Sequence, residues 1–419
     1  MINAPRGTKD ILPPVSSYWQ YVEQQARDLF SVYNYDEIRT PIFEYTELFQ
    51  RGIGEVTDIV EKEMYTFQDR GGRSITLRPE GTASVVRSFL ENKIYGRAQP
   101  TKYYYCGPMF RYERPQAGRY RQFHQLGVEA LGSNDPYLDA EIISLGVNFL
   151  HNLGLENLEI IINSIGCPQC RPNFVEKLKG FVEEKQEEFC SDCIRRLDSN
   201  PLRILDCKNE ECSSAIAAAP RIIDFLCTEC EQHFAAVRGN LELLNITYQV
   251  QPALVRGLDY YTNTAFEVKF SDLGAQDTIF GGGRYNGLTE EVGGRRIPAV
   301  GFALGVERLL LTLEEQDIEL PVDNLLDILI INIGEKARRN AFELCSELRK
   351  YDVKTDMDYL DRSVGGQMKM ADRQGAKYTI IIGENELEKE VVVLHDMKSG
   401  EEREVPDNKI IDTVIEAVK

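Results

Sequence analysis

The segment 103–132, YYYCGPMFRYERPQAGRYRQFHQLGVEALG, constrains the fold more than any other part of the chain. Two extended runs flank the turn-prone residues 115–118, a pattern that predicts a β-hairpin. Side chains alternate between the two faces of a strand, so one face of this hairpin collects charged, polar and aromatic groups. That face comprises Arg111 and Glu113 on the first arm and Arg121, Phe123, Gln125, Gly127 and Glu129 on the second.

This face suits a polar ligand better than a hydrophobic core, because unpaired charges are costly to bury. Phe123 and Glu129 are six residues apart, which is roughly 20 Å along a strand at about 3.3 Å per residue. A nucleotide joined to an amino acid has that length. The hairpin therefore predicts a ligand surface.

Length and composition describe a multidomain enzyme-like protein. A chain of 419 residues predicts two or three domains, and 42% hydrophobic with 27% charged residues is typical of a soluble globular protein. No apolar run is long enough to cross a bilayer and residues 1–20 lack the features of a signal peptide, so we expect a cytoplasmic protein. The net charge of −19 argues against gripping nucleic acid through a bulk positive field but leaves room for local basic contacts.

Eight of the ten cysteines lie in four close pairs, three of them with CxxC spacing. This spacing suits one or two structural zinc ions in an inserted module, while free thiols in a helical segment are the alternative. The sequence does not reveal how the pairs combine. A catalytic thiol is disfavoured, because only His233 lies near a pair. The pairs are Cys167 and Cys170, Cys190 and Cys193, Cys207 and Cys212, and Cys227 and Cys230.

The N-terminal part has an α+β pattern. Helices are predicted at 17–33 and 135–153, at the segment VERLLLTLEE, and after TL, where Pro79 and Glu80 suit a helix start. Strands are predicted at 75–77, in YDEIRTP up to Pro41, and in LEIIINSIG, LVRGLDYYTNTAFEVKF, TIFGGGRYNGL and AVGFALG. The charged, cysteine-rich block at about 167–240 interrupts this pattern and indicates an insertion.

After a linker at about 314–323 the chain alternates strands with helices. Strands are expected in LDILIINIG, VKTDMD, KYTIIIG and VVVLHD, and helices at 336–350 and 364–374. These elements predict a compact α/β domain of about 95 residues with a mixed sheet.

Arginines recur in the segments that carry polar side chains. A scattered arginine usually lies on a solvated surface, but Arg256 lies in an aromatic, apolar run where an unpaired cation is costly. Arg308 begins a helix whose other face is Leu-rich. The guanidinium fork matches phosphate oxygens. The glycines at 281–283, Gly301 and Gly305 allow close approach of a ligand, although GGG alone is more often a turn. Neither GxGxxG nor GxxxxGK[ST] occurs in a position that supports a Rossmann or Walker site.

Several motifs resemble those of class II aminoacyl-tRNA synthetases. FRYE followed by a loop and RYRQF is similar to their motif 2, AVGFALGVERLLL to motif 3, and YDEIRTP to motif 1. PRGTKDILP, TLRPEGT, LVRGLDYYTNTAFEV and GGGRYNGL resemble segments typical of the histidyl-tRNA synthetase family. The resemblance covers essentially the whole chain. It implies a class II antiparallel-sheet catalytic domain at 1–322, with a mainly helical module inserted at about 167–240, and an α/β anticodon-binding domain at 323–419.

The resemblance implies a role for each matching residue. For ATP, it implies that Phe123 stacks on adenine, Glu113 accepts from its amine, Arg111 holds the α-phosphate, and Arg119 and Arg308 hold the terminal phosphates. For histidine, it implies that Glu80, Thr82 and Gln125 bind the α-ammonium, Arg111 the carboxylate, and Glu129 and Tyr261 the imidazole, with Tyr260 and Tyr285 closing the pocket. Arg256, opposite Arg111, is expected to stabilise charge at the α-phosphate.

The implied reaction forms histidyl-adenylate and pyrophosphate and then transfers histidine to tRNA(His), with Mg²⁺ on the β- and γ-phosphates and Gln116 near the acceptor stem. Motif 1 implies a homodimer. The alternatives are a regulatory subunit of ATP phosphoribosyltransferase and an RNA-sensing module of the kind attached to stress kinases. The first typically departs at RGLDYY and lacks the anticodon-binding domain, whereas both are present, and no kinase segment occurs.

Overall fold

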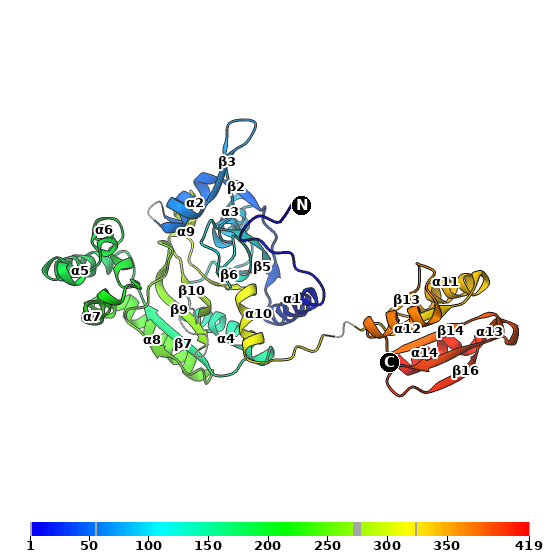
Figure 1. The fold of residues 1–419 in the computed structure, drawn as a ribbon. Helices are drawn as coiled ribbons and strands as arrows, with labels where there is room; N and C mark the ends of the chain where they lie inside the picture. The colour runs from blue at the N-terminus through cyan, green and yellow to red at the C-terminus, as the bar shows by residue number, and fades with distance from the viewer. Residues whose placement is uncertain (1, 55–56, 117, 271–277, 323–324, 419) are drawn as a thin grey trace. The chain divides into compact units, whose positions relative to one another are not determined.

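The chain folds into two compact units, Met1–Leu320 and Pro321–Lys419 (Figure 1). The computed structural model describes residues 2–54, 57–116, 118–270, 278–322 and 325–418. Within those ranges, no helix combines the length and apolar character that crossing a membrane requires.

An eight-stranded sheet, ordered β1-β5-β6-β11-β10-β9-β7-β8, forms the centre of the first unit. Neighbours from β5 to β7 are antiparallel, and only the outer pairs β1–β5 and β7–β8 are parallel. Its strands are β1 Asp36–Glu37, β5 Thr101–Phe110, β6 Gln122–Leu131, β7 Leu158–Ser164, β8 Gln249–Val250, β9 Thr262–Phe270, β10 Thr278–Arg284 and β11 Ala299–Gly305.

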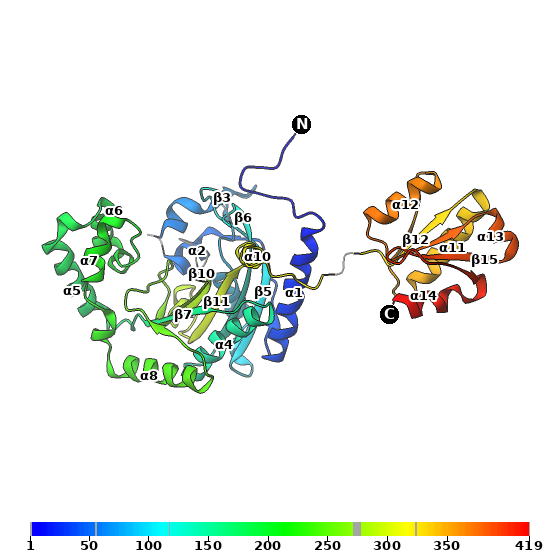
Figure 2. The same cartoon turned by 60° about the horizontal axis from the view of Figure 1, so that its bottom comes forward.

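Helices α1 (Val15–Val32), α4 (Pro136–Asn152) and α8 (Thr228–Leu243) cover one face of this sheet (Figure 2). Their apolar positions meet alternate residues of the strands, because successive strand residues point to opposite faces. In β6, Leu126, Val128 and Ala130 enter this core. The intervening residues of β6 therefore point to the opposite face of the sheet.

A three-stranded antiparallel sheet, ordered β2-β4-β3, lies next to α2. Its strands are β2 Phe43–Tyr45, β3 Tyr65–Gln68 and β4 Ser74–Leu77. The other helices of the first unit, apart from those of the inserted module, are α2 Thr46–Ile53, η1 Ile59–Glu63, α3 Thr82–Glu91, η2 Ile94–Gly96, α9 Leu288–Glu291 and α10 Val306–Glu315.

The segment between β7 and β9 contains the inserted, mainly helical module. Helices α5, α6 and α7 gather together in both ribbon views, and α8 returns along α4 (Figures 1 and 2). The module has α5 Arg171–Glu184, η3 Gln186–Glu188, α6 Ser191–Ser199, η4 Pro201–Ile204, η5 Glu210–Cys212, α7 Ser213–Ala217 and η6 Ile222–Phe225 before α8.

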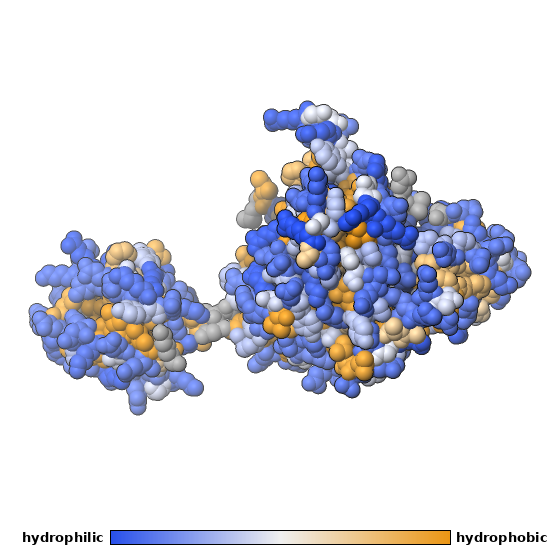
Figure 3. Space-filling model, turned by 180° about the vertical axis from the view of Figure 1, so that it is seen from behind, coloured by the Kyte–Doolittle hydropathy of each residue, from blue (hydrophilic) through white to orange (hydrophobic). Residues whose placement is uncertain are grey.

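The second unit has a five-stranded mixed sheet, ordered β13-β12-β14-β15-β16. β12 is parallel to β13 and β14, and the other pairs are antiparallel, so the predicted mixed α/β architecture is confirmed. Its elements are β12 Ile328–Asn332, α11 Glu335–Arg349, β13 Thr355–Met357, α12 Val364–Arg373, β14 Tyr378–Ile382, α13 Glu384–Lys389, β15 Val391–Asp396, β16 Glu402–Pro406, η8 Asp407–Lys409 and α14 Ile410–Val418. On the face drawn in Figure 3, each unit is mostly hydrophilic with smaller apolar areas.

Four local expectations were wrong. The hairpin strands stop at Phe110 and resume at Gln122, so Arg111 and Glu113 lie in the connecting loop and not on a strand. Arg256 lies in irregular backbone before β9, not in a strand. The helix expected to open with Pro79 begins at Thr82, although Glu80 does bind its first N–H groups as a helix-start residue. The strand expected up to Pro41 is only the two-residue β1. Ala117, in the predicted turn, lies outside the described residues.

Candidate active site

A pocket lies on the face of the eight-stranded sheet opposite the α1, α4 and α8 core. Strand β6 directs Phe123, Gln125 and Glu129 into it. The structure brings together every residue that the sequence suggested for ATP or histidine binding, whereas their individual roles stay predictions. The pocket is lined by Glu80, Thr82, Arg111, Glu113, Arg119, Phe123, Gln125, Glu129, Arg256, Tyr260, Tyr261, Tyr285 and Arg308, together with neighbouring backbone and apolar groups.

Glu129 is the most deeply buried acid of this pocket, with 1% of its surface exposed. Oγ1 of Thr82 donates a hydrogen bond of 2.6 Å to Oε1, and the Tyr285 hydroxyl donates to Oε2. Burial raises the pKa of Glu129 to about 8, although both hydrogen bonds favour the carboxylate. A buried carboxyl with a pKa in this range is suited to bind a nitrogen base that can share its proton.

Two glycines make room for charged side chains of the protein itself. A Cβ at Gly301 would lie 1.9 Å from Oε2 of Glu129, and one at Gly281 would lie 2.5 Å from Nη1 of Arg256. Neither contact is possible for a side chain larger than hydrogen. Both glycines line the pocket, so the prediction that they allow close approach of a ligand stands. The structure adds a second reason: they make room for the Glu129 carboxylate and the Arg256 guanidinium.

Three tyrosines form one wall next to Glu129. The ring of Tyr260 lies 4.7 Å from that of Tyr261 and 5.6 Å from that of Tyr285. Burial raises the pKa of all three phenols, which keeps them neutral hydrogen-bond donors at physiological pH. Tyr285 uses its hydroxyl on Glu129, a contact that was not foreseen.

Glu80 holds the start of α3. Its carboxylate accepts the backbone N–H groups of Thr82 at 2.7 Å and Ala83 at 2.8 Å. These bonds satisfy helix N–H groups that otherwise lack partners. Burial nevertheless raises the pKa of Glu80. The acidic group at the helix start is therefore fixed in place at the edge of the pocket.

The loop that follows β5 carries a compact charged group. Nε of Arg111 donates to the carbonyl of Pro79 at 2.9 Å, and its guanidinium lies 5.3 Å from the ring centre of Phe123. Glu113 pairs with Nε of Arg119 at 2.6 Å. A cation over the Phe123 ring marks that ring as a surface on which planar groups stack.

On the other side of the pocket, Arg256 pairs with Glu267 of β9. Oγ1 of Thr278 donates to the second oxygen of Glu267 at 3.2 Å, and the Thr278 carbonyl accepts from Nη1 of Arg308 at 2.9 Å. Sequence reasoning missed Glu267 and Thr278. The available signal for Glu267 was a charged residue within an apolar strand, and its register partner is Gly281.

Two further polar residues, Gln125 and Glu307, line the pocket, whereas Arg121 does not. Oε1 of Gln125 is buried and has no hydrogen-bond partner among the described residues, so it is free to accept from a ligand. Glu307, which was not predicted, lines the pocket and accepts the backbone N–H of His124 at 2.9 Å. Arg121, expected on the ligand face, is not part of the lining; its guanidinium lies 3.9 Å from the ring centre of Tyr112.

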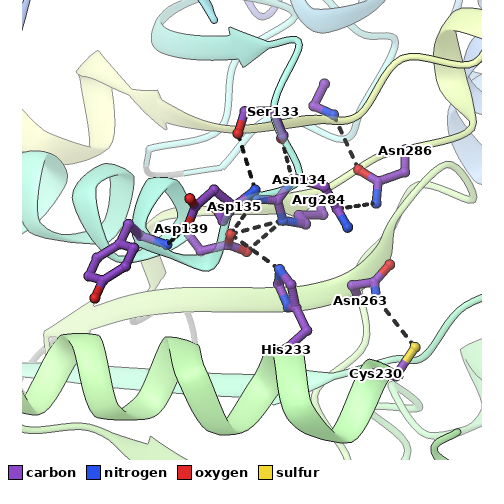
Figure 4. Close-up of polar contacts among 11 residues, drawn as sticks. Ser133, Asn134, Asp135, Asp139, Cys230, His233, Asn263, Arg284 and Asn286 are labelled. Atoms are coloured by element: carbon purple, nitrogen blue, oxygen red, sulfur yellow. Dashed lines mark hydrogen bonds and ion pairs between the residues drawn. The ribbon is translucent and has the colours of Figure 1, made fainter. Parts of the chain in front are cut away.

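A buried ion pair anchors the end of β10 beside Tyr285. Arg284 and Asp139 both have no exposed side-chain surface, and Nε of Arg284 lies 2.8 and 3.0 Å from the two carboxylate oxygens (Figure 4). The guanidinium also donates to the carbonyls of Ser133 and Asp135. His233 on α8 lies 3.6 Å from Asp139, and burial lowers the pKa of its imidazole. Arg284 was not predicted, because its partner lies 145 residues away.

The paired cysteines form two separate groups in the inserted module, both away from the pocket lining. The first and fourth pairs come together, and the second and third pairs come together. The pairing that the sequence left open is therefore resolved. The groups are Cys167, Cys170, Cys227 and Cys230, and Cys190, Cys193, Cys207 and Cys212.

An antiparallel sheet with a charged pocket on the face opposite the α1, α4 and α8 core is the architecture of a class II aminoacyl-tRNA synthetase, here joined to an α/β unit. A family model for histidyl-tRNA synthetase matches residues 7–309, and one for the anticodon binding domain matches 327–417. The chain belongs to the histidyl-tRNA synthetase family, whose members are aminoacyl-tRNA ligases.

Known relatives are similar to this chain over nearly its whole length. The histidine–tRNA ligase of Halothermothrix orenii is 64% identical over 96% of each chain, and that of Caldanaerobacter subterraneus is 51% identical over all of both. The crystal structure of apo histidyl-tRNA synthetase from S. aureus is similar with a TM-score of 0.85 and 46% identity, over 99% of this chain and all of that one.

Proposed function

We propose that this pocket binds ATP and L-histidine together, catalyses formation of histidyl-adenylate and pyrophosphate, and then supports transfer of histidine to the 3′ end of tRNA(His). The observation that carries the proposal is the convergence of the Glu129 carboxyl, the tyrosine wall and four arginines in one pocket. Membership in the histidyl-tRNA synthetase family supports the choice of amino acid.

Glu129 and Tyr261 bind the imidazole ring of histidine, with Tyr260 and Tyr285 closing the pocket. A site that pairs both ring nitrogens rejects side chains without them, because its buried polar groups are then left unpaired. Glu80, Thr82 and Gln125 bind the α-ammonium group; the unpartnered Oε1 of Gln125 supports this role.

ATP lies along the other half of the pocket. Phe123 stacks on adenine and Glu113 accepts from its amine, which requires Arg119 to exchange its pairing with Glu113 for a phosphate oxygen. Arg119 and Arg308 then hold the terminal phosphates, and Mg²⁺ accompanies the β- and γ-phosphates. Binding of ATP thus replaces the ion pair between Arg119 and Glu113 by one between Arg119 and a phosphate oxygen.

Arg111 and Arg256 act on the reacting centre. Arg111 orients the histidine carboxylate and the α-phosphate, and Arg256 stabilises the charge that grows on that phosphate as the carboxylate attacks it. Pairing with Glu267 fixes Arg256 before substrate binds, so little reorganisation accompanies the reaction. The step is a displacement driven by positioning and electrostatics, with no covalent protein intermediate.

The second unit binds the anticodon of tRNA(His), as its family match suggests. The loop with Gln116 meets the acceptor stem. We place the enzyme in the cytoplasm, where tRNA charging serves protein synthesis. The clustered cysteines lie outside the pocket lining, so zinc held there has a structural role.

We also propose a homodimer that buries the three-stranded sheet. Its strands expose Phe43, Tyr45 and Phe67, with 57%, 54% and 48% of their surfaces accessible, and Tyr45 and Phe67 both pair with Ile75. Large apolar groups that gather on a surface usually mark an interface. Phe43→Asp should yield monomers in analytical ultracentrifugation, whereas Phe342→Asp, exposed in the second unit, should leave dimers. Monomeric wild-type protein would contradict this part.

The test of the function is ATP–pyrophosphate exchange that depends strictly on histidine. Arg256→Ala should lower the exchange rate by at least about 10²–10³-fold, the usual cost of losing a preorganised donor. Histidine binding, measured by calorimetry, should stay largely intact. Arg51→Ala, on the exposed surface of α2, is the matched control. Wild-type protein that binds histidine without pyrophosphate exchange would favour the regulatory-subunit alternative. Loss of both exchange and histidine binding in folded Arg256→Ala would contradict the role assigned to Arg256.

A further inference from the structure

The two cysteine groups of the inserted module have the geometry of closed metal sites. We name Cys167, Cys170, Cys227 and Cys230 the basal cluster and Cys190, Cys193, Cys207 and Cys212 the distal cluster. In each cluster all four sulfur atoms lie within 4.8 Å of one another. Tetrahedral zinc with Zn–S bonds of about 2.3 Å places its sulfurs about 3.8 Å apart.

Measured sulfur separations match that value. Sγ of Cys167 lies 3.6 Å from Sγ of Cys170 and 3.9 Å from Sγ of Cys227, and Sγ of Cys190 lies 3.7 Å from Sγ of Cys207. A disulfide has a sulfur separation near 2.05 Å. All ten cysteines are free, so cross-links do not explain the clusters.

Hydrogen-bond donors surround the sulfurs. The backbone N–H of Cys227 points to Sγ of Cys170 at 3.1 Å, and that of Cys190 points to Sγ of Cys212 at 3.2 Å. Nδ2 of Asn263 on β9 donates to Sγ of Cys230 at 3.3 Å (Figure 4). Such donors stabilise thiolates and orient metal ligands. Four thiolates in contact repel one another strongly unless a cation lies between them.

We propose that each cluster binds one Zn²⁺ ion, giving two structural zinc sites in one chain, and that the basal site positions the histidine-binding loop 256–261. Four cysteine ligands leave no open coordination position, so neither zinc takes part in the reaction. The sites are nested: the basal zinc joins the two ends of the module, and the distal zinc joins two pairs within it.

The basal cluster is connected to the pocket through Arg171 and Asn263. Asn263, which contacts Cys230, also exchanges backbone hydrogen bonds with Ile165 and Gly166 at 2.8 and 2.9 Å. The guanidinium of Arg171, next to Cys170, donates to the backbone carbonyl of Tyr261. Tyr261 lines the pocket. The basal zinc thus fixes the first turn of α5, and Arg171 transmits that position to the loop.

The distal part of the module contacts the same loop from another side. Nδ2 of Asn200 donates to the carboxylate of Asp259, while Arg196 and Arg203 approach Asp58 at 3.7 and 3.9 Å. Asn200 is uncharged, and the two arginines reach a half-exposed carboxylate at long distances, so each ion pair is weak. The distal zinc should therefore affect the pocket less than the basal zinc does.

The first test counts metal in untagged, full-length protein dialysed against metal-free buffer. We expect two zinc ions per chain by elemental analysis, falling to one in Cys167→Ser/Cys170→Ser and to one in Cys190→Ser/Cys193→Ser. Cys106→Ser/Cys345→Ser, which changes only cysteines outside the clusters, should keep two. Fewer than one metal ion per wild-type chain, iron in place of zinc, or eight thiols lost to disulfides would overturn the proposal.

A spectroscopic test does not depend on the folding of cysteine variants. Wild-type protein grown with cobalt should show thiolate-to-cobalt charge transfer and the visible bands of tetrahedral coordination, with an intensity that corresponds to two ions per chain. Octahedral spectra, or none, would overturn the assignment of eight sulfur ligands. The cobalt spectrum is independent of amino-acid activation, so it tests the metal sites separately from the proposed function.

The second test addresses the loop and rests on the proposed function. Arg171→Ala should retain both zinc ions, raise the KM for histidine in pyrophosphate exchange at least about tenfold, and leave the KM for ATP nearly unchanged. Arg171→Lys should recover part of the loss, because it keeps one donor. Equal changes in both KM values, or an unchanged KM for histidine, would show that Arg171 does not position this loop.

Discussion

Gly301 on β11 lies directly opposite Glu129 on β6, and a methyl group there would lie 1.9 Å from Oε2 of Glu129. The buried carboxyl therefore keeps its position only because its neighbour has no side chain. A Cβ at Gly301 would also lie 2.4 Å from the backbone carbonyl oxygen of Val128, so β11 must shift as well. We predict that Gly301→Ala displaces Glu129 and weakens histidine binding by at least about 10–100-fold, the cost of one hydrogen bond to a charged group. Calorimetry and the KM for histidine measure the effect.

Gly287→Ala is the matched control for this substitution. A Cβ at Gly287 meets no atom closer than 3.8 Å, so the variant should bind histidine like the wild type. If Gly301→Ala bound histidine normally, Glu129 would not be the residue that holds the imidazole.

The protonation of Glu129 predicts a specific pH dependence of stability. Its pKa is raised from 4.5 to about 8 by burial, so the folded protein retains a proton that the unfolded chain releases. The contribution of this group is fully present below about pH 4.5 and is lost as the pH rises through about 8, with a slope of at most about 1.4 kcal/mol per pH unit. Glu129→Gln removes this loss.

Urea unfolding followed by the fluorescence of Trp19, the single tryptophan, measures the free energy of unfolding of the first unit. The stability of Glu129→Gln relative to the wild type should increase between pH 5 and pH 8.5. Glu47→Gln, on the exposed side of α2, should give a curve parallel to the wild type. A difference that is the same at every pH would contradict the raised pKa.

Much of the site could be predicted from local patterns. The hairpin and the arginine-bearing segments are runs of neighbouring residues, and the alternation along β6 follows from strand geometry alone. The inserted module was visible as a break in that pattern. Its mainly helical content was implied only by the family resemblance.

The partners of these residues could not be predicted, because they depend on register between distant segments. Glu267 faces Gly281 across β9 and β10, and Arg284 reaches Asp139 on α4. The nested cysteine groups follow from where β7 and α8 place the ends of the module. A one-residue shift of register would reverse which side chains share a face, and the sequence of one strand alone does not determine its register with the next strand.

Glu267 is expected to act by positioning Arg256. Glu267→Gln keeps the shape but removes the charge of the pair, so Arg256 should become mobile and the rate of adenylate formation should fall roughly tenfold, with histidine binding unchanged. Glu159→Gln on the adjacent strand β7, outside the pocket lining, is the control. A normal rate in single-turnover measurements would show that Arg256 needs no such partner.

The ion pair of Arg284 and Asp139 should be the most sensitive structural contact near the pocket. Both side chains are fully buried, so Asp139→Asn leaves a buried cation without its countercharge and should lower the free energy of unfolding by about 3–5 kcal/mol. Replacement of both groups by apolar ones, Asp139→Leu with Arg284→Met, should cost less than the single change, because no charge is then left unpaired. The exposed pair of Arg51 and Glu47 is the reference: Glu47→Gln should change stability by no more than about 1 kcal/mol. Urea unfolding of the three variants decides the matter, and a single Asp139→Asn change as mild as Glu47→Gln would mean that water or a neighbouring group compensates Arg284.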